Sequence, residues 1–213
     1  MRKIELQEIF ALVPSVLSRY LDFSLDILLS TLRSMREAQI SLPSRPEDID
    51  GLSLTAEVSD DPEIENVTYN GWKTDHRITN VLVFSPKGVI IDAVLNAPGS
   101  WHDSHTARPI FHRLLTQVPD GFYLVADTAF PHGPTSISGK IKAPIKAGQQ
   151  WGMRTMQGSF GRLRVLLCIN SQSSRLRLLE LCCRLFNVRS NCIGINQICS
   201  VYLKLLEEGH VIG

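Results

Sequence analysis

Several features that would place this chain in a simple functional class are missing from its sequence. No apolar run approaches the roughly 18 residues that a membrane span needs, so we do not expect a membrane protein. No N-terminal stretch reads as a secretory signal, and the odd number of cysteines does not suggest a disulfide framework, so we expect a reducing, intracellular setting. The sequence also has no large excess of either positive or negative charge. The net charge is +1 at pH 7 and gives by itself no argument for nucleic acid.

The five cysteines lack the spacing of a zinc site. Four of them lie within the 18 positions from Cys182 to Cys199, but no C-x2-C pair exists. The adjacent Cys182 and Cys183 cannot easily chelate one metal ion. We therefore interpret them as buried thiols on a helix, with structural zinc as the disfavoured alternative.

Basic residues are unevenly distributed. Between Lys140 and Arg189, Lys and Arg clearly outnumber acids, and Glu180 is the only acid. Such a basic half could face phosphate groups, as in nucleic-acid binding. A solvated charged face is the equally good alternative on composition alone.

The N-terminal part predicts two helices. Residues 4–11 form a short amphipathic pattern, and a long apolar periodicity begins near Ser15 as the N-cap. Residues 1–40 therefore read as a helical segment resembling a helix-turn-helix, which either binds DNA or packs onto the next domain. The stretch "SLPSRPED" is rich in proline and charge and marks a boundary.

The rest of the chain, residues 48–205, predicts an α/β domain in which a sheet is flanked by helices. Period-two alternation, or a nearly continuous apolar run, indicates strands, and three- to four-residue periodicity indicates helices. Strands are expected over 52–58, 77–85, 88–96 and 121–130, with the middle two joined as a hairpin by "PKG". Helices are expected over 103–117, 149–164, 173–190 (capped by Ser173 or Ser174) and 195–208.

Two aspartates stand beside predicted strands. Asp50 precedes the first strand, and Asp127 ends the apolar run "FYLVA". A half-buried carboxylate has a raised pKa unless a cation relieves it, and hard oxygen ligands suit Mg²⁺ or Mn²⁺. Carboxylates that meet in space can hold two metal ions about 4 Å apart for phosphodiester chemistry. The alternative for each aspartate is a turn or helix cap.

Four stretches resemble the DDE endonuclease domain of Harbinger-type transposases. They are "IDGLSL", "YNGWKTDHRITNVLVFSPKGVIIDAVLNAPGSWHDS", "ADTAFPHG" and "FGRLR", in this order. The resemblance extends upstream through "LQEIFALVPSVLSRYLDFSLDILLSTLRSM". It implies an RNase H-like mixed sheet, divalent Mg²⁺ or Mn²⁺, and hydrolytic cleavage and transfer of DNA strands in the nucleus.

The resemblance also assigns residues. It implies that Asp50 and Asp127 are catalytic metal ligands and that Asp103 caps the following helix, with contact to metal or substrate as the alternative. His102 and His105 are expected to be hydrogen-bonded scaffold, and Asn187 a helix C-cap. Trp72 and Trp101 are expected in the core or at its rim. The residues expected to contact DNA phosphates are Lys73, His76, Arg77, Arg162 and Arg164, with a merely solvated surface as the alternative. Partners implied are DNA, a separate Myb-like DNA-binding protein and a second copy of the chain.

Two positions depart from that pattern. The family's third acid is a glutamate, and the position aligned with it here is Gln150, whose amide oxygen is a weaker ligand for a hard cation. The residues before Asp50 contain two prolines and do not predict a buried strand. Segments thus look deleted, which fits a decayed transposon copy, a misassembled gene model, or a domesticated, catalytically inactive protein that binds DNA or protein. Enzyme activity in this copy stays open.

Overall fold

The computed structural model describes residues 3–42, 47–55, 61–85, 87–120, 122–126, 129–131, 136–142, 156, 158–164, 167 and 171–193. For residues 3–5, 47–55, 136, 162 and 164 it describes the backbone alone. The described elements alternate between helices and strands, which confirms an α/β fold. None of the described helices is long and apolar enough to cross a membrane.

The described strands form one mixed sheet of six. Strand β3 (Asp75–Phe84) is central and pairs antiparallel with β1 (Glu47–Thr55), with β4 (Ile90–Pro98) and with the short β2 (Tyr69–Asn70). On its other side β1 pairs in parallel with β5 (Leu124–Val125), and β5 pairs in parallel with β6 (Ile141–Lys142). An antiparallel half and a parallel half therefore meet at β1.

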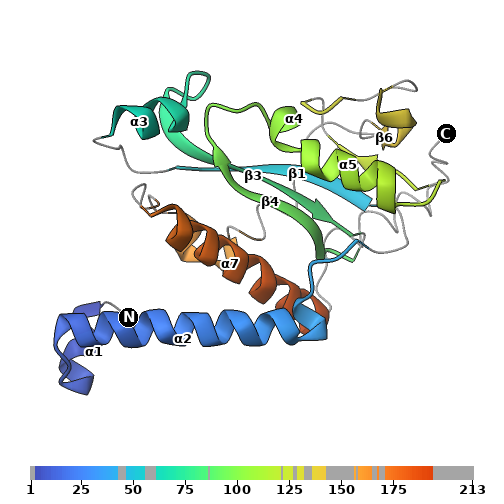
Figure 1. Ribbon diagram of the computed structural model, residues 1–213. Helices are drawn as coiled ribbons and strands as arrows, with labels where there is room; N and C mark the ends of the chain where they lie inside the picture. The colour runs from blue at the N-terminus through green and yellow to red at the C-terminus, as the bar shows by residue number, and fades with distance from the viewer. Residues whose placement is uncertain are drawn as a thin grey trace.

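Helices cover both faces of the sheet. Figure 1 shows α4 (Asp103–Thr106) and α5 (Arg108–Gln117) on one face and α7 (Gln172–Ile193) on the other. The alternation of β3 supplies both cores, since successive side chains point to opposite faces. One core joins Leu82, Phe84 and Ile90 of the sheet to Leu179, Cys183 and Phe186 of α7, and the other joins Val81, Val83 and Ile91 to Ala107, Ile110 and Leu114.

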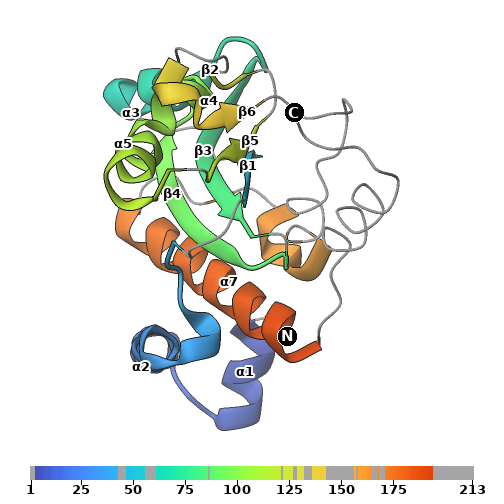
Figure 2. The same ribbon diagram turned by 90° about the vertical axis from the view of Figure 1, so that its right-hand side faces the viewer.

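The N-terminal helices α1 (Lys3–Phe10) and α2 (Pro14–Ser34) lie outside this sandwich. Helix α2, which the short 3₁₀ turn η1 (Arg36–Ala38) follows, packs against α7, as Figures 1 and 2 both show. Packing of this segment onto the next domain is therefore observed, and DNA binding by it stays a prediction. The helix begins at Pro14, with Val13 as N-cap, so the predicted cap at Ser15 is wrong. Proline fits the first helical position because no helical partner is lost there.

Several boundaries differ from those expected. Strand β1 starts at Glu47, three residues before Asp50, so the expectation that no strand runs into Asp50 is wrong. The two prolines on which that expectation rested precede the strand in the sequence. The helix expected over 103–117 is broken at Ala107, and α5 begins at Arg108 with Pro109 in its first turn. Helix α7 begins at Gln172, and the Ser171 hydroxyl accepts from the Ser174 N–H at 3.3 Å, so the cap is Ser171.

The hairpin between β3 and β4 is confirmed. The Ser85 N–H donates to the Val89 carbonyl at 2.8 Å and the Gly88 N–H donates to the Ser85 carbonyl at 2.7 Å. Gly88 has φ of 72°, a left-handed conformation that glycine adopts at little cost. Of the helix expected over 149–164, residues 149–155 and 157 lie outside the described residues, and Gly161–Arg164 form a 3₁₀ turn. The helix expected over 195–208 lies outside them entirely.

Candidate functional site

Asp50 lies within β1, at the strand where the two halves of the sheet meet. It pairs with Leu82 of β3 on the antiparallel side. On the parallel side the described pairing ends at Asp48 and Val125. Asp50 is two residues beyond Asp48, and Asp127 is two residues beyond Val125 in the sequence. Asp127 and Gln150 lie outside the described residues, so the meeting of the two aspartates stays a prediction.

The turn at Asn70 and Gly71 and the turn at Gly99 and Ser100 lie against each other at one end of the antiparallel half. The Asn70 side chain donates from Nδ2 to the Gly99 carbonyl at 2.7 Å, and the Ser100 N–H donates to the Val67 carbonyl at 3.2 Å. A Cβ at Gly99 would lie 2.1 Å from the Arg77 carbonyl oxygen, closer than any side-chain atom can approach. Glycine is therefore required where these turns meet.

The histidine-rich turn that follows is part of the scaffold. His102, not Asp103, is the N-cap of α4: its Nδ1 accepts from the Ser104 N–H at 3.3 Å and lies 2.8 Å from the Ser104 hydroxyl. The prediction that Asp103 caps the helix is thus wrong, because Asp103 is already the first helical residue. The His105 ring contacts Trp101 edge-on, with centroids 4.6 Å apart, and its hydrogen bonding stays a prediction.

The described residues do not by themselves make a metal centre. No group of three His, Cys, Asp or Glu among them could hold a metal ion. Of the α7 cysteines, Cys192 is exposed, whereas Cys182 and Cys183 are buried. Burial raises the pKa of Cys182 to about 11 and raises that of Cys183 as well, which disfavours the thiolate that a metal ion binds. This confirms the interpretation of these two cysteines as buried thiols. Metal ligation by Asp103 stays a prediction.

The predicted DNA-contacting residues fall into two groups. Lys73 is exposed, and Arg77, which is half-buried, lies 3.8 Å from the Asp75 carboxylate. Arg77 pairs with Thr55, five residues from Asp50, which is about 17 Å at about 3.4 Å per strand residue. Contact of Lys73 and Arg77 with DNA stays a prediction. Arg162 and Arg164 lie in a 3₁₀ turn of which only the backbone is described, and their contact with DNA stays a prediction.

A buried polar network beside β1 was not foreseen. Asn80 of β3 is fully buried, pairs with Leu52 of β1, and its Oδ1 accepts from the Asn96 N–H at 2.8 Å. Asn96 sits at a β-bulge with φ of 63°, and its Oδ1 accepts from Nε of the buried Arg175 at 2.9 Å. An asparagine can adopt this left-handed backbone, but no local pattern indicates that Arg175 of α7 reaches it.

Asn187 and Trp72 also differ from their predictions. Asn187 does not end α7: it is fully buried inside the helix, accepts from the Ile90 N–H at 2.7 Å, and donates to the carbonyls of Ile90 and Gln39. It ties the first residue of β4 and the N-terminal segment to α7. Trp72 has 90 % of its surface exposed and belongs to neither core nor rim, whereas Trp101, at 45 %, is a rim residue.

The comparisons with known proteins concern the segment that carries Asp50, Asp127 and the two turns. Residues 49–152 match the family of DDE superfamily endonucleases. The match begins one residue before Asp50 and ends two residues after Gln150, so it spans both aspartates and both turns. Helix α7 and the two arginines of the 3₁₀ turn lie outside it. The comparison with curated proteins and the comparison with solved structures each found no match.

Proposed function

We propose that this chain is a transposase-derived DDE endonuclease domain of the Harbinger type, in which Asp50 and Asp127 hold a divalent metal ion for DNA strand cleavage. The family match supports a transposase-derived nuclease ancestry with DNA as substrate. DDE superfamily endonucleases generally use divalent metals. The finer assignment is supported by the quoted motifs and by the strand order, in which an antiparallel trio is extended on the β1 side by two parallel strands, as expected of an RNase H-like sheet.

The parallel register of β1 and β5 carries the proposal. If the pairing of Asp48 with Val125 continues for two residues, position 127 stands beside Asp50. Paired strands lie about 4.8 Å apart, which suits two carboxylates that share a cation. Two negative charges at that separation repel each other, and a bound cation offsets this repulsion. The pair therefore predicts affinity for Mg²⁺ or Mn²⁺.

The donor chemistry fits a hard divalent cation, since carboxylate oxygens are its usual protein ligands. When bound, such an ion lowers the pKa of a water and stabilises negative charge on the leaving oxygen of a phosphodiester. Asp50 and Asp127 would hold it, with Asp103 as a further candidate. Phosphates along the bound DNA would be neutralised by Lys73, Arg77, Arg162 and Arg164.

Gln150 favours a second candidate function. A neutral amide at the third position weakens the metal site, which would leave a DNA-binding derivative with little or no cleavage. In that case a domesticated or decayed copy keeps its DNA contacts and acts in the nucleus, with a Myb-like protein or a second copy as partner.

A DNA cleavage assay tests the proposal. We expect nicking of supercoiled DNA in Mn²⁺, abolished by chelation and by Asp127→Asn, and unchanged by Asp120→Asn at a fully exposed acid. Nicking that persists after chelation and in Asp127→Asn would refute the nuclease assignment. Absent nicking, together with salt-dependent DNA binding that survives Asp50→Asn and Asp127→Asn, would establish the second candidate instead.

A further inference from the structure

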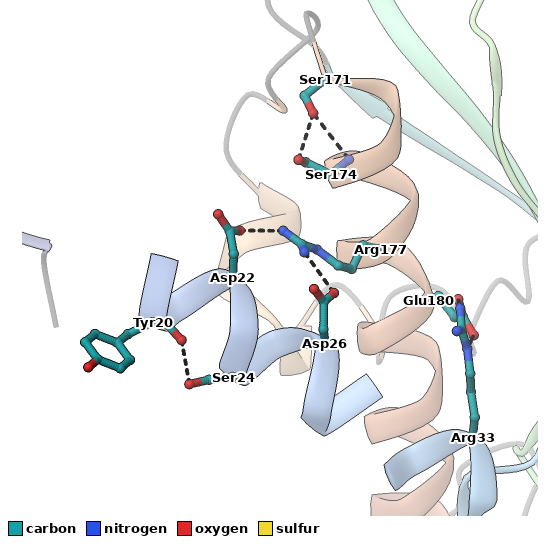
Figure 3. Close-up of polar contacts among 9 residues, drawn as sticks. All are labelled: Tyr20, Asp22, Ser24, Asp26, Arg33, Ser171, Ser174, Arg177 and Glu180. Atoms are coloured by element: carbon teal, nitrogen blue, oxygen red, sulfur yellow. Dashed lines mark hydrogen bonds and ion pairs between the residues drawn. The ribbon is translucent and has the colours of Figure 1, made fainter. Parts of the chain in front are cut away.

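Helix α2 has a second apolar stripe on the side turned away from α7. The members of this stripe, which we call the α2 seam, recur at alternating intervals of three and four residues from the N-cap onwards: Val13, Val16, Tyr20, Phe23 and Ile27. Four of them have more than half of their surface exposed, and Val16 is half-buried. In Figure 3 the Tyr20 ring points away from α7, whereas Asp22 and Asp26 point towards it.

The spacing of the α2 seam is that of a coiled-coil face. Apolar residues at alternating intervals of three and four form the a and d positions of a heptad, and the positions between them are normally polar. The seam covers two heptads, which is too short for a stable isolated coiled coil. Because α2 is already folded against α7, however, association through the seam does not require a helix to form. A second helix with the same kind of stripe would therefore fit it.

Charges on one flank of the seam favour a second copy of α2 as that helix. Arg19 and Asp26 each lie one position before a seam residue, so they occupy the same flank. An antiparallel pair can place Tyr20 opposite Phe23 of the second copy. In that register Arg19 faces Asp26 of the second copy, and the two-fold symmetry repeats the ion pair.

The same charges select the antiparallel direction. In a parallel pair, Ser24 and Thr31 of the second copy would stand opposite Arg19 and Asp26, and no ion pair would form. Asp26 also contacts Arg177, but 63 % of its side chain is exposed, so the carboxylate can accept a further donor.

The exposed area of the seam sets the strength of such a contact. Each exposed seam side chain presents roughly 100 Å², so the seam offers about 400 Å² per copy. A standard interface buries about 800 Å² per partner, of which the polar rim supplies a part. The contact therefore lies at the weak end of specific interfaces, and we expect a dimer with a Kd on the order of micromolar.

We propose that two copies of this chain associate through an antiparallel pair of α2 seams. Tyr20 lies opposite Phe23 of the second copy in the middle of the contact. Val16 lies opposite Ile27 of the second copy at each end. Figures 1 and 2 show α2 at the edge of the molecule with α7 and the sheet on one side of it, so neither copy blocks the approach of the other. This inference does not depend on the proposed nuclease function.

Disulfide trapping tests the contact and its direction. Chains carrying Val16→Cys are mixed with chains carrying Ile27→Cys and oxidised, and peptide mass spectrometry identifies the linked positions. We expect a disulfide between positions 16 and 27 in the mixture. Neither variant alone should link to itself at these positions, because like positions in the antiparallel pair lie about 16 Å apart along the axis. A disulfide between two Ile27→Cys chains, which indicates a parallel pair, or no link between chains at either position would overturn the proposal.

Sedimentation equilibrium of the full chain measures the strength of the dimer. Phe23→Asp should raise the dimer Kd by about tenfold or more, because association would bury an unpaired charge. Arg19→Glu, which turns the ion pair into a repulsion, should raise it by about threefold. Leu115→Asp is the control at another exposed apolar side chain, on α5, and should leave the Kd unchanged. A native chain that is monomeric at about 100 micromolar, or equal Kd values for Phe23→Asp and Leu115→Asp, would overturn the proposal.

Discussion

The two halves of the sheet are built very differently. Strands β1, β3 and β4 of the antiparallel half are nine or ten residues long, whereas β5 and β6 of the parallel half have two residues each. Five residues connect β3 to β4, while the whole hairpin and three described helices, α3 (Pro62–Thr68), α4 and α5, lie between β1 and β5 in the sequence. Asp50 belongs to the strand that both halves share. The antiparallel half thus fixes the position of Asp50, and the parallel half determines which residue lies beside it.

The difference shows how each half is stabilised. The antiparallel half depends on long ladders, which are interrupted by bulges between β3 and β4, and on close backbone approach at its turns. The parallel half depends more on side chains that tie its short strands to neighbouring helices. Damage to a turn of the first half should therefore cost more than loss of a single side-chain tie in the second.

The largest effect is expected at Gly99. In Gly99→Ala the new methyl group would collide with the backbone carbonyls of Arg77 and Thr68, so the backbone at position 99 must move away, and we expect a loss of about 3 kcal/mol or more. Gly71→Ala is the matched control, because no atom lies within 4 Å of its Cβ position, and it should change stability by less than about 1 kcal/mol. Urea denaturation measures both, and equal losses would contradict the close approach.

The tie between β4 and α5 comes next. Arg113 donates from Nε and Nη2 to both oxygens of the buried Asp92 at 2.7 Å. Arg113→Met would leave that carboxylate unpaired, at a cost of about 2–3 kcal/mol. Arg177→Met removes a similar forked contact to the exposed Asp22 and Asp26, drawn in Figure 3, and should cost less than about 1 kcal/mol. A larger loss for Arg177→Met in urea denaturation would reverse this order.

In the parallel half the corresponding tie is Lys140. Its buried Nζ donates to the Val118 carbonyl at 2.7 Å, just beyond the end of α5, where a cation is favoured by the helix dipole. Lys140→Met should lower the free energy of unfolding by about 1–2 kcal/mol. Lys142→Met, which removes only a contact over the Tyr123 ring at 4.1 Å, should lose about half as much. Thermal unfolding of both variants checks the order, and a neutral Lys140→Met would show that the tie contributes nothing.

The smallest effect belongs to the helices outside the sheet. Hydrogen bonds from Arg33, then Arg184, hold the pKa of Glu180 below its usual value, and Figure 3 shows the pair with Arg33. Because the pKa of Glu180 is lower in the folded chain than in the unfolded chain, its contribution to stability is complete above the unfolded-state pKa of about 4.3. This contribution is lost as the pH falls through the folded-state pKa.

The stability difference between the native chain and Glu180→Gln should therefore be at most about 1 kcal/mol at pH 7. Below about pH 4 it should shrink towards zero. Urea denaturation at several pH values measures this difference. A difference that grows in acid would contradict the sign of the shift.

Local patterns made much of the antiparallel half predictable. The alternation on either side of "PKG" gave the hairpin, and the apolar periodicity gave α2 and α7. The proline at position 109 was a signal for the break at Ala107 that the apolar pattern of the helix concealed. Trp72 was misplaced because a large aromatic side chain favours burial on average, although nothing in a local pattern requires it.

Pairings between distant segments could not be predicted. Asn187 was interpreted as a helix end, because its partner, Ile90, is 97 residues away in the sequence. The parallel pairing of β1 with β5 joins residues 77 positions apart, and its two-residue length leaves little periodicity to read. For the candidate site, the sequence supplied Asp50 and Asp127, but only the register beside Asp48 indicates how they could meet.

Calorimetric titration with Mn²⁺ tests the central claim, that Asp50 and Asp127 share one cation. We predict saturable binding to the native chain, lost in Asp50→Asn and in Asp127→Asn alike, and retained in Asp120→Asn. The Gln150→Glu variant should bind more tightly, because it adds the missing negative charge. Binding that survives both Asp50→Asn and Asp127→Asn, or no binding to either the native chain or Gln150→Glu, would contradict the account.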